Sequence, residues 1–86
     1  KINEDEYIFE KAKDICENVL NIEPNHVSNL ENYAISLCAL AELKNDINLA
    51  KKAIQYFEKY IVSLFLINKM LYCKKLNKII ERTPYD

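Results

Sequence analysis

Residues 60–67 decide the fold, and they read Tyr60-Ile61-Val62-Ser63-Leu64-Phe65-Leu66-Ile67. Apolar side chains fall on nearly every side of a helix in this stretch, and neither Pro nor Gly interrupts it. A helix that is hydrophobic all round is normally covered all round. The stretch therefore predicts a helical segment whose cover comes from its helical neighbours and a second molecule.

A stripe of positions spaced three and four residues apart runs through this stretch. Its members are Ala50, Ile54, Phe57, Ile61, Phe65, Asn68, Tyr72, Leu76 and Ile79. Their mean step is close to 3.6 residues, which predicts one continuous helix over residues 47–81. Such a helix is roughly 50 Å long at 1.5 Å per residue, about twice the length of its neighbours. Two outcomes stay open: a straight helix that buries its far half on another chain, or a break near Ser63 and a fourth helix. The straight helix is favoured, because a β-branched residue beside Ser and Leu offers poor turn material.

A first helix is predicted over residues 3–22. Asn3 is the expected N-cap, and Glu6 three residues later completes a capping box. Apolar residues then recur at helical spacing until Ile22. Pro24 ends this helix because it lacks an N–H donor and disfavours the helical conformation at Glu23.

A second helix is predicted over residues 26–44, with Asn25 as its N-cap. Asn45 then takes the left-handed conformation that a helix end often requires, since the chain has no Gly. Asp46 caps the third helix. Both joints are short, so neighbouring helices should run antiparallel.

The composition supports an all-α fold class with a single small domain. The chain has 86 residues, no Gly, 50% hydrophobic residues and a net charge of -1. The absence of Gly removes the glycine-rich phosphate-binding loops. No uncharged run approaches the roughly 18 residues of a membrane span, so none is predicted. Because the chain begins with Lys rather than Met, we expect it to be a segment of a longer protein.

Charge is unevenly distributed between the two halves of the sequence. Residues 1–43 carry nine acidic and three basic side chains, and residues 44–86 carry four acidic and nine basic ones. One interpretation is that two solvated faces complement each other within the fold. The other is that a basic terminal helix recruits an acidic partner.

Residues 12–37 carry a recognisable spacing. They read Ala12-x3-Cys16-x2-Val19-Leu20-x-Ile22-x-Pro24-Asn25, followed by Leu30-x2-Tyr33-Ala34-x2-Leu37. This pattern resembles the tetratricopeptide repeat, a helix–turn–helix unit that stacks into interaction scaffolds. The resemblance extends over about residues 12–61 and implies a tetratricopeptide-like antiparallel hairpin. An unrelated helical bundle with the same periodicity is the alternative.

Some members of that family grip a peptide's C-terminal carboxylate with a Lys/Asn clamp. Asn32 occupies a position where such an Asn is found. However, residues 27–43 contain no Lys or Arg, and carboxylate capture requires positive charge. Asn32 is therefore predicted to be a polar residue of the surface or of a groove.

No catalytic or metal site is predicted, and no cofactor. His26 is the sole histidine, and no CxxC or HxxxH spacing occurs. Cys16, Cys38 and Cys73 all lie within apolar stripes, which predicts reduced thiols packed in a core. That usage is typical of an intracellular, reducing compartment, the cytosol or nucleus.

Four basic residues near the C-terminus form a candidate basic patch: Lys74, Lys75, Lys78 and Arg82. A nucleic-acid binder would usually present a wider basic surface, and the pI here is about 5.9. A solvated outer helix face is the favoured interpretation.

Together these features predict a non-catalytic protein-interaction or assembly module. Its partner is a protein, either a second copy or a member of a larger complex. The predicted interface comprises Ile61, Leu64, Phe65, Leu66, Ile67, Leu71 and Tyr72. The alternative function is a peptide-recruiting, co-chaperone-like tetratricopeptide adaptor.

Overall fold

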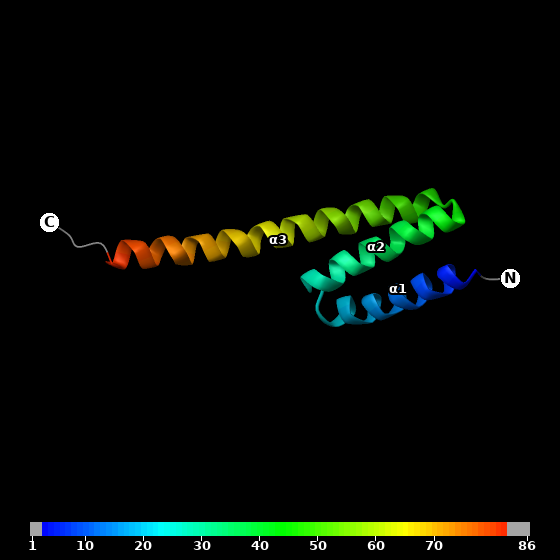
Figure 1. The fold of residues 1–86 in the computed structure, drawn as a ribbon, viewed down its shortest axis with the longest axis horizontal. Coiled ribbons are helices and arrows are strands. Elements are labelled where there is room, and N and C mark those ends of the chain that lie inside the picture. The colour runs from blue at the N-terminus through cyan, green and yellow to red at the C-terminus, as the bar shows by residue number, and fades with distance from the viewer. Residues whose placement is uncertain (1–2, 83–86) are drawn as a thin grey trace.

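The computed structural model describes residues 3–82, apart from the side chains of Tyr72, Ile80 and Arg82. The described residues form three α-helices and no strand: α1 (Glu4–Ile22), α2 (Val27–Lys44) and α3 (Ile47–Arg82). This confirms the all-α fold class. Figure 1 shows that α1 and α2 form an antiparallel hairpin, and that α3 returns along α2 and continues far beyond it. Helix α3 is unbroken through Ser63, so the predicted straight helix is confirmed and the fold-back into a fourth helix is wrong.

Helix α1 begins and ends where the sequence predicts. The Asn3 Oδ1 atom accepts a hydrogen bond from the Asp5 N–H at 2.8 Å. At the other end, the Glu23 N–H donates to the Val19 carbonyl at 2.8 Å, immediately before Pro24. Local capping chemistry therefore fixes both ends of α1.

The N-cap of α2 lies one residue later in the chain than predicted. The prediction of Asn25 as N-cap is wrong, because His26 occupies that position. The His26 N–H donates to the Glu23 carbonyl at 3.1 Å and closes a turn around Pro24 and Asn25. The His26 Nδ1 atom then accepts from the Asn29 N–H at 3.4 Å. The turn needs Asn25 in its interior, which leaves His26 as the last residue before the helix.

The joint between α2 and α3 confirms both of its predicted residues. Asn45 is left-handed, with φ 51° and ψ 48°. The Asp46 Oδ1 atom accepts hydrogen bonds from the N–H groups of Asn48 (2.9 Å) and Leu49 (3.3 Å). The chain thus reverses direction without a Gly.

Helix α2 supplies the centre of the core. Its largest fully buried side chains are Leu30, Tyr33, Leu37 and Leu40. Helix α1 contributes Cys16 and Leu20, and α3 contributes Ala53. Since α2 packs against both α1 and α3, its buried residues occupy a wide arc of its surface.

Helix α3 uses a different face against α2 from the one that the apolar stripe predicts. The residues packed on the core are Leu49, Ala53, Tyr56 and Tyr60, whereas Ile54 of the stripe is 58% exposed. The small side chain of Ala53 permits close approach of α3, and Tyr56 packs edge-on against Tyr33 with ring centroids 4.6 Å apart. Tyr56 and Tyr60 lie at the edge of the core, partly buried and partly in contact with solvent. A tyrosine combines an apolar ring with a polar hydroxyl, so it suits this position better than Ile or Phe.

The molecule is strongly elongated. Its principal extents are 74 × 22 × 19 Å and its radius of gyration is 18.7 Å. A compact domain of this length has a radius of gyration of about 12 Å. Helix α2 is roughly 27 Å long and α3 roughly 54 Å at 1.5 Å per residue, so about half of α3 extends past the hairpin (Figure 1).

The three cysteines do not share one environment. Cys16 is buried, as predicted, but Cys38 and Cys73 are exposed. The prediction that all three pack in a core is therefore wrong for the latter two. Cys38 borders a groove between the end of α2 and the start of α3, beside Ala41 and Ala50. Cys73 lies on the part of α3 that extends past the hairpin.

Candidate protein-interaction surface

The distal segment of α3, which we define as residues 61–79, exposes large apolar side chains. Ile61 is 61% exposed, Phe65 64% and Leu76 56%. Exposed apolar residues are common singly, but a contiguous patch of more than a few hundred Å² is characteristic of an interaction site. The distal segment carries most of the exposed large apolar side chains of α3.

The accessible surface of the whole chain shows how much this segment leaves uncovered. The chain exposes 6997 Å². A compact monomer of 10.1 kDa exposes about 5,300 Å² by the usual scaling with mass. The difference is roughly 1,700 Å², and the half of α3 that lacks a neighbouring helix contributes to it.

The predicted interface residues do not share one face. Each lies on one of three lines along the helix, as helical geometry requires. Ile61 and Phe65 belong to the apolar stripe of residues 50–79, which we now call the outer stripe. Leu64, Ile67 and Leu71 continue the line of the residues that contact α2, and Leu66 lies on a third side. The side chain of Tyr72 lies outside the described residues.

An apolar pocket lies where α2 begins alongside α3. It measures about 540 Å³, and Val27 faces Val62, Leu66 and Ile67 there. This pocket marks the point at which the cover from α2 stops. Leu64 is 38% exposed and Leu71 53%, so exposure increases along the same line beyond the pocket.

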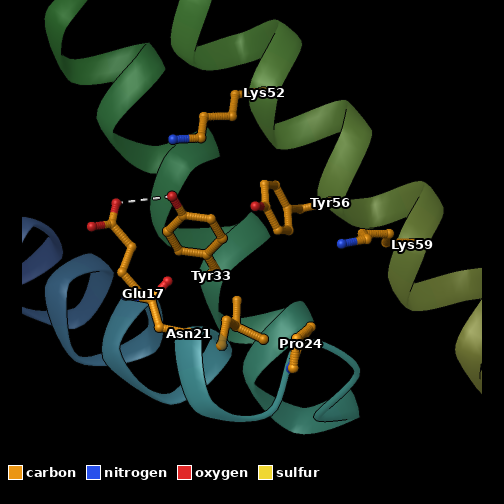
Figure 2. Close-up of a pocket in the computed structure, with 8 residues that line it drawn as sticks. Glu17, Asn21, Pro24, Tyr33, Lys52, Tyr56 and Lys59 are labelled. Carbon is orange, nitrogen blue, oxygen red and sulfur yellow. Dashed lines mark hydrogen bonds between the residues drawn. The ribbon is translucent and has the colours of Figure 1, made fainter.

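A second, more polar cleft is lined by residues of all three helices (Figure 2). Its volume is about 390 Å³, and Glu17, Tyr33 and Tyr56 line it together with Lys52 and Lys59. The Tyr33 hydroxyl donates to Glu17 Oε1 at 2.9 Å. Burial, followed by this hydrogen bond, raises the pKa of Tyr33. Tyr33 therefore stays protonated as a donor to the carboxylate.

Two lysines of α3 border this cleft. The Lys52 Nζ atom lies 5.6 Å from the Tyr33 ring centroid, and the Lys59 Nζ atom lies 5.5 Å from the Tyr56 ring centroid. Cation–π contacts at these distances hold an ammonium group weakly at an exposed site. The cleft thus combines an acidic wall on α1 with a basic wall on α3. Sequence reasoning missed it, because its residues come from three helices and their spacing carries no signal.

Asn32 does not lie in this cleft. It is exposed and borders a shallow groove between α1 and α2, beside Ile8, Ile15 and Ile35. Its backbone carbonyl accepts a hydrogen bond from the Ser36 hydroxyl at 2.9 Å. Neither Lys nor Arg lines that groove, so the structure does not assemble a carboxylate clamp around Asn32 within the described part of the chain.

The candidate basic patch is located on the distal segment and its end. Lys74, Lys75 and Lys78 are exposed, and the side chain of Arg82 lies outside the described residues. Lys74 and Lys78 share one side of the helix by their spacing of four. The structure places no acidic side chain in an ion pair with these three lysines within residues 3–82.

Glu10 ties the acidic first helix to the end of the second. Its carboxylate pairs with Lys44 of α2 and with Lys13, the latter at 3.0 Å. Hydrogen bonds from Lys44 and then Lys13 hold the pKa of Glu10 below its usual value. Part of the opposite charge in the two halves of the sequence is therefore matched within the fold.

Residues 3–82 contain no group of three or more His, Cys, Asp or Glu side chains arranged to hold a metal ion. No helix in this range has both the length and the hydropathy required to cross a membrane. Comparison with known proteins finds no family model, no curated protein and no solved structure that matches the chain.

Proposed function

We propose that this chain is a non-catalytic protein-interaction module that docks a partner helix on the distal segment of α3. The observation that carries the proposal is the exposure of Phe65, Ile61 and Leu76 on an unbroken continuation of α3. Burial of apolar surface is the main driving force of most protein association. The tetratricopeptide-like character is part of this proposal, and the antiparallel packing of α2 between α1 and α3 supports it.

The proposed compartment is the reducing interior of a cell, cytosol or nucleus. Support comes from Cys38 and Cys73, which are exposed as free thiols. Exposed thiols persist in reducing compartments and become oxidised elsewhere.

A photo-crosslinking amino acid at position 65 tests the docking surface. We expect an adduct between the distal segment and a protein partner, and we expect Leu76→Glu to abolish it. The matched control places the same probe at Tyr7, an aromatic residue of α1 that is 55% exposed. The probe at position 65 is tested with the purified chain and in an extract of its source cells. If it yields no more adduct than the Tyr7 control in both experiments, the proposal is wrong.

The cleft around Tyr33 and Tyr56 favours a second candidate function, recruitment of a short acidic peptide. Lys52 and Lys59 supply the positive charge, and the two rings supply apolar contact. Fluorescence anisotropy with a labelled acidic peptide tests it. We expect Lys52→Ala with Lys59→Ala to weaken binding at least tenfold, while Lys51→Ala on another side of α3 leaves it unchanged. Equal binding by both variants excludes this function.

A further inference from the structure

The outer stripe is nearly symmetric about Asn68. Towards the N-terminus the next positions are Phe65, Ile61 and Phe57, at steps of three, four and four. Towards the C-terminus they are residues 72, 76 and 79, at steps of four, four and three. Two antiparallel copies of this stripe therefore match in layers: 57 with 79, 61 with 76, 65 with 72, and 68 with itself. Every layer is apolar except the central pair of Asn68 residues.

We propose that the occupant of the outer stripe is a second copy of this chain, antiparallel and related by a two-fold axis beside Asn68. This inference rests on the proposed function and specifies its partner. A two-fold interface uses the same patch on both chains, so the patch must be self-complementary. The outer stripe meets that condition. An Asn side chain carries both a donor and an acceptor, so two Asn68 amides satisfy each other across the axis.

The polar centre also selects the register. A single Asn within an otherwise apolar helix interface fixes the alignment, because any other register buries its amide against apolar side chains. Sliding one chain by a turn would place Asn68 opposite residue 72 or 65. Only the symmetric register pairs the two amides with each other.

Charge selects the antiparallel orientation. A parallel pair would bring Lys75, which flanks the outer stripe, beside its own copy in the other chain. In the antiparallel pair each Lys75 lies roughly 20 Å along the axis from its mate, at 1.5 Å per residue. That separation exceeds the Debye length of about 8 Å at physiological ionic strength. The basic end of each chain then lies beside the hairpin end of the other chain and away from its own copy.

The size of the interface fits a stable dimer. Because Phe57 is half-buried, the open part of the outer stripe runs from Ile61 to Ile79. Its six positions at about 100 Å² each give roughly 600 Å² per chain, the lower end of the range for specific interfaces. The hairpin does not obstruct the pairing. It lies at one end of α3 (Figure 1), so the two hairpins of an antiparallel pair lie at opposite ends. Ile54 and Ile61 show that α2 leaves this face of α3 open, at 58% and 61% exposed.

Mass measurement with matched charge substitutions tests self-association. Interfaces of this size have Kd values from micromolar downwards, so light scattering and sedimentation equilibrium are run at about 10–100 µM. We expect about twice the chain mass of 10.1 kDa. Phe65→Glu should give the monomer mass while retaining its helical circular dichroism. Met70→Glu is the control, because Met70 is also exposed (62%) but lies on the opposite side of the distal segment. A dimer that survives Phe65→Glu but not Met70→Glu overturns the assignment of the outer stripe.

Disulfide trapping tests the register, in a background in which the exposed cysteines are replaced by Ser. Ile61→Cys and Leu76→Cys chains should each remain uncrosslinked alone, since each introduced thiol lies about 22 Å from its own mate. When the two chains are mixed and oxidised, a mixed disulfide should form, because positions 61 and 76 share a layer and a disulfide requires Cα atoms within about 7 Å. Cross-linking of each variant with itself, and not with the other, would demonstrate a parallel pair and overturn the inference.

The combined results separate this inference from the proposed function. A monomer at 100 µM whose position-65 probe forms an adduct with a different protein overturns the second copy and retains the docking surface. A monomer whose probe forms no adduct overturns both.

Discussion

A Leu→Ala substitution at Leu37 and the same substitution at Leu66 compare a buried position with an exposed one. Leu37 is fully buried in α2, whereas Leu66 is 52% exposed on the distal segment. Replacing a buried Leu by Ala costs about 2–5 kcal/mol. A chain of this size is stable by roughly 4–13 kcal/mol in total, so Leu37→Ala removes a large share of the free energy of unfolding. Leu66→Ala should cost less than about 1 kcal/mol, since half of its apolar surface already contacts water and Ala is the stronger helix former.

Urea denaturation followed by circular dichroism measures both changes. The difference in midpoint converts to free energy when the two variants share the same m-value. Leu66 lies away from the outer stripe, so self-association does not obscure the comparison. Equal losses from Leu37→Ala and Leu66→Ala would refute the division of the molecule into a hairpin core and an uncovered distal segment.

Two further predictions concern titratable groups. Hydrogen bonds from Lys44 and Lys13 hold the pKa of folded Glu10 below its ordinary value of 4.5. The ionised Glu10 carboxylate therefore stabilises the fold above about pH 4.5, and this contribution is lost as the pH falls through the folded pKa. Glu10→Gln should therefore flatten the decrease of Tm between pH 5 and pH 3, and an unchanged slope would contradict the assignment. Burial raises the pKa of the Cys16 thiol. A thiol reagent should therefore label Cys38 and Cys73 of the native chain fast and Cys16 slowly. Equal labelling rates for all three thiols would show that the core is open at Cys16.

Short-range chemistry made much of this fold predictable. The apolar periodicity indicated all three helices, and Asn3, Asn45 and Asp46 lie at the helix ends as their side-chain chemistry requires. Pro24 was sufficient to end α1. The N-cap of α2 was not predictable in the same way, because Asn25 and His26 are both able to cap and the turn around Pro24 decides between them.

The contact face of α3 depends on tertiary packing, which periodicity alone does not report. Two apolar lines run along α3, and the stripe with Ile54 and Phe65 is the more hydrophobic one. The hairpin nevertheless packs against the line with Ala53 and Tyr56, because Tyr33 provides an edge-on aromatic partner there. The predicted interface residues lie on the exposed distal segment, but they divide among three sides of the helix. The cleft around Tyr33 required three helices to be in place before it existed.

Helix formation and association are coupled in the distal segment. Residues 64–79 lie largely beyond α2, and a helical stretch of this length with little tertiary packing is marginal in water, so it depends on cover that the hairpin does not supply. Residues 49–60 differ, because α2 protects them through Ala53 and Tyr60. Amide hydrogen exchange should therefore be slow in both regions at high concentration, and dilution or Phe65→Glu should accelerate it in residues 64–79 alone. If the Phe65→Glu chain kept slow amide exchange in residues 64–79, the distal helix would be stable by itself. A partner would then not be needed to explain why this segment is helical.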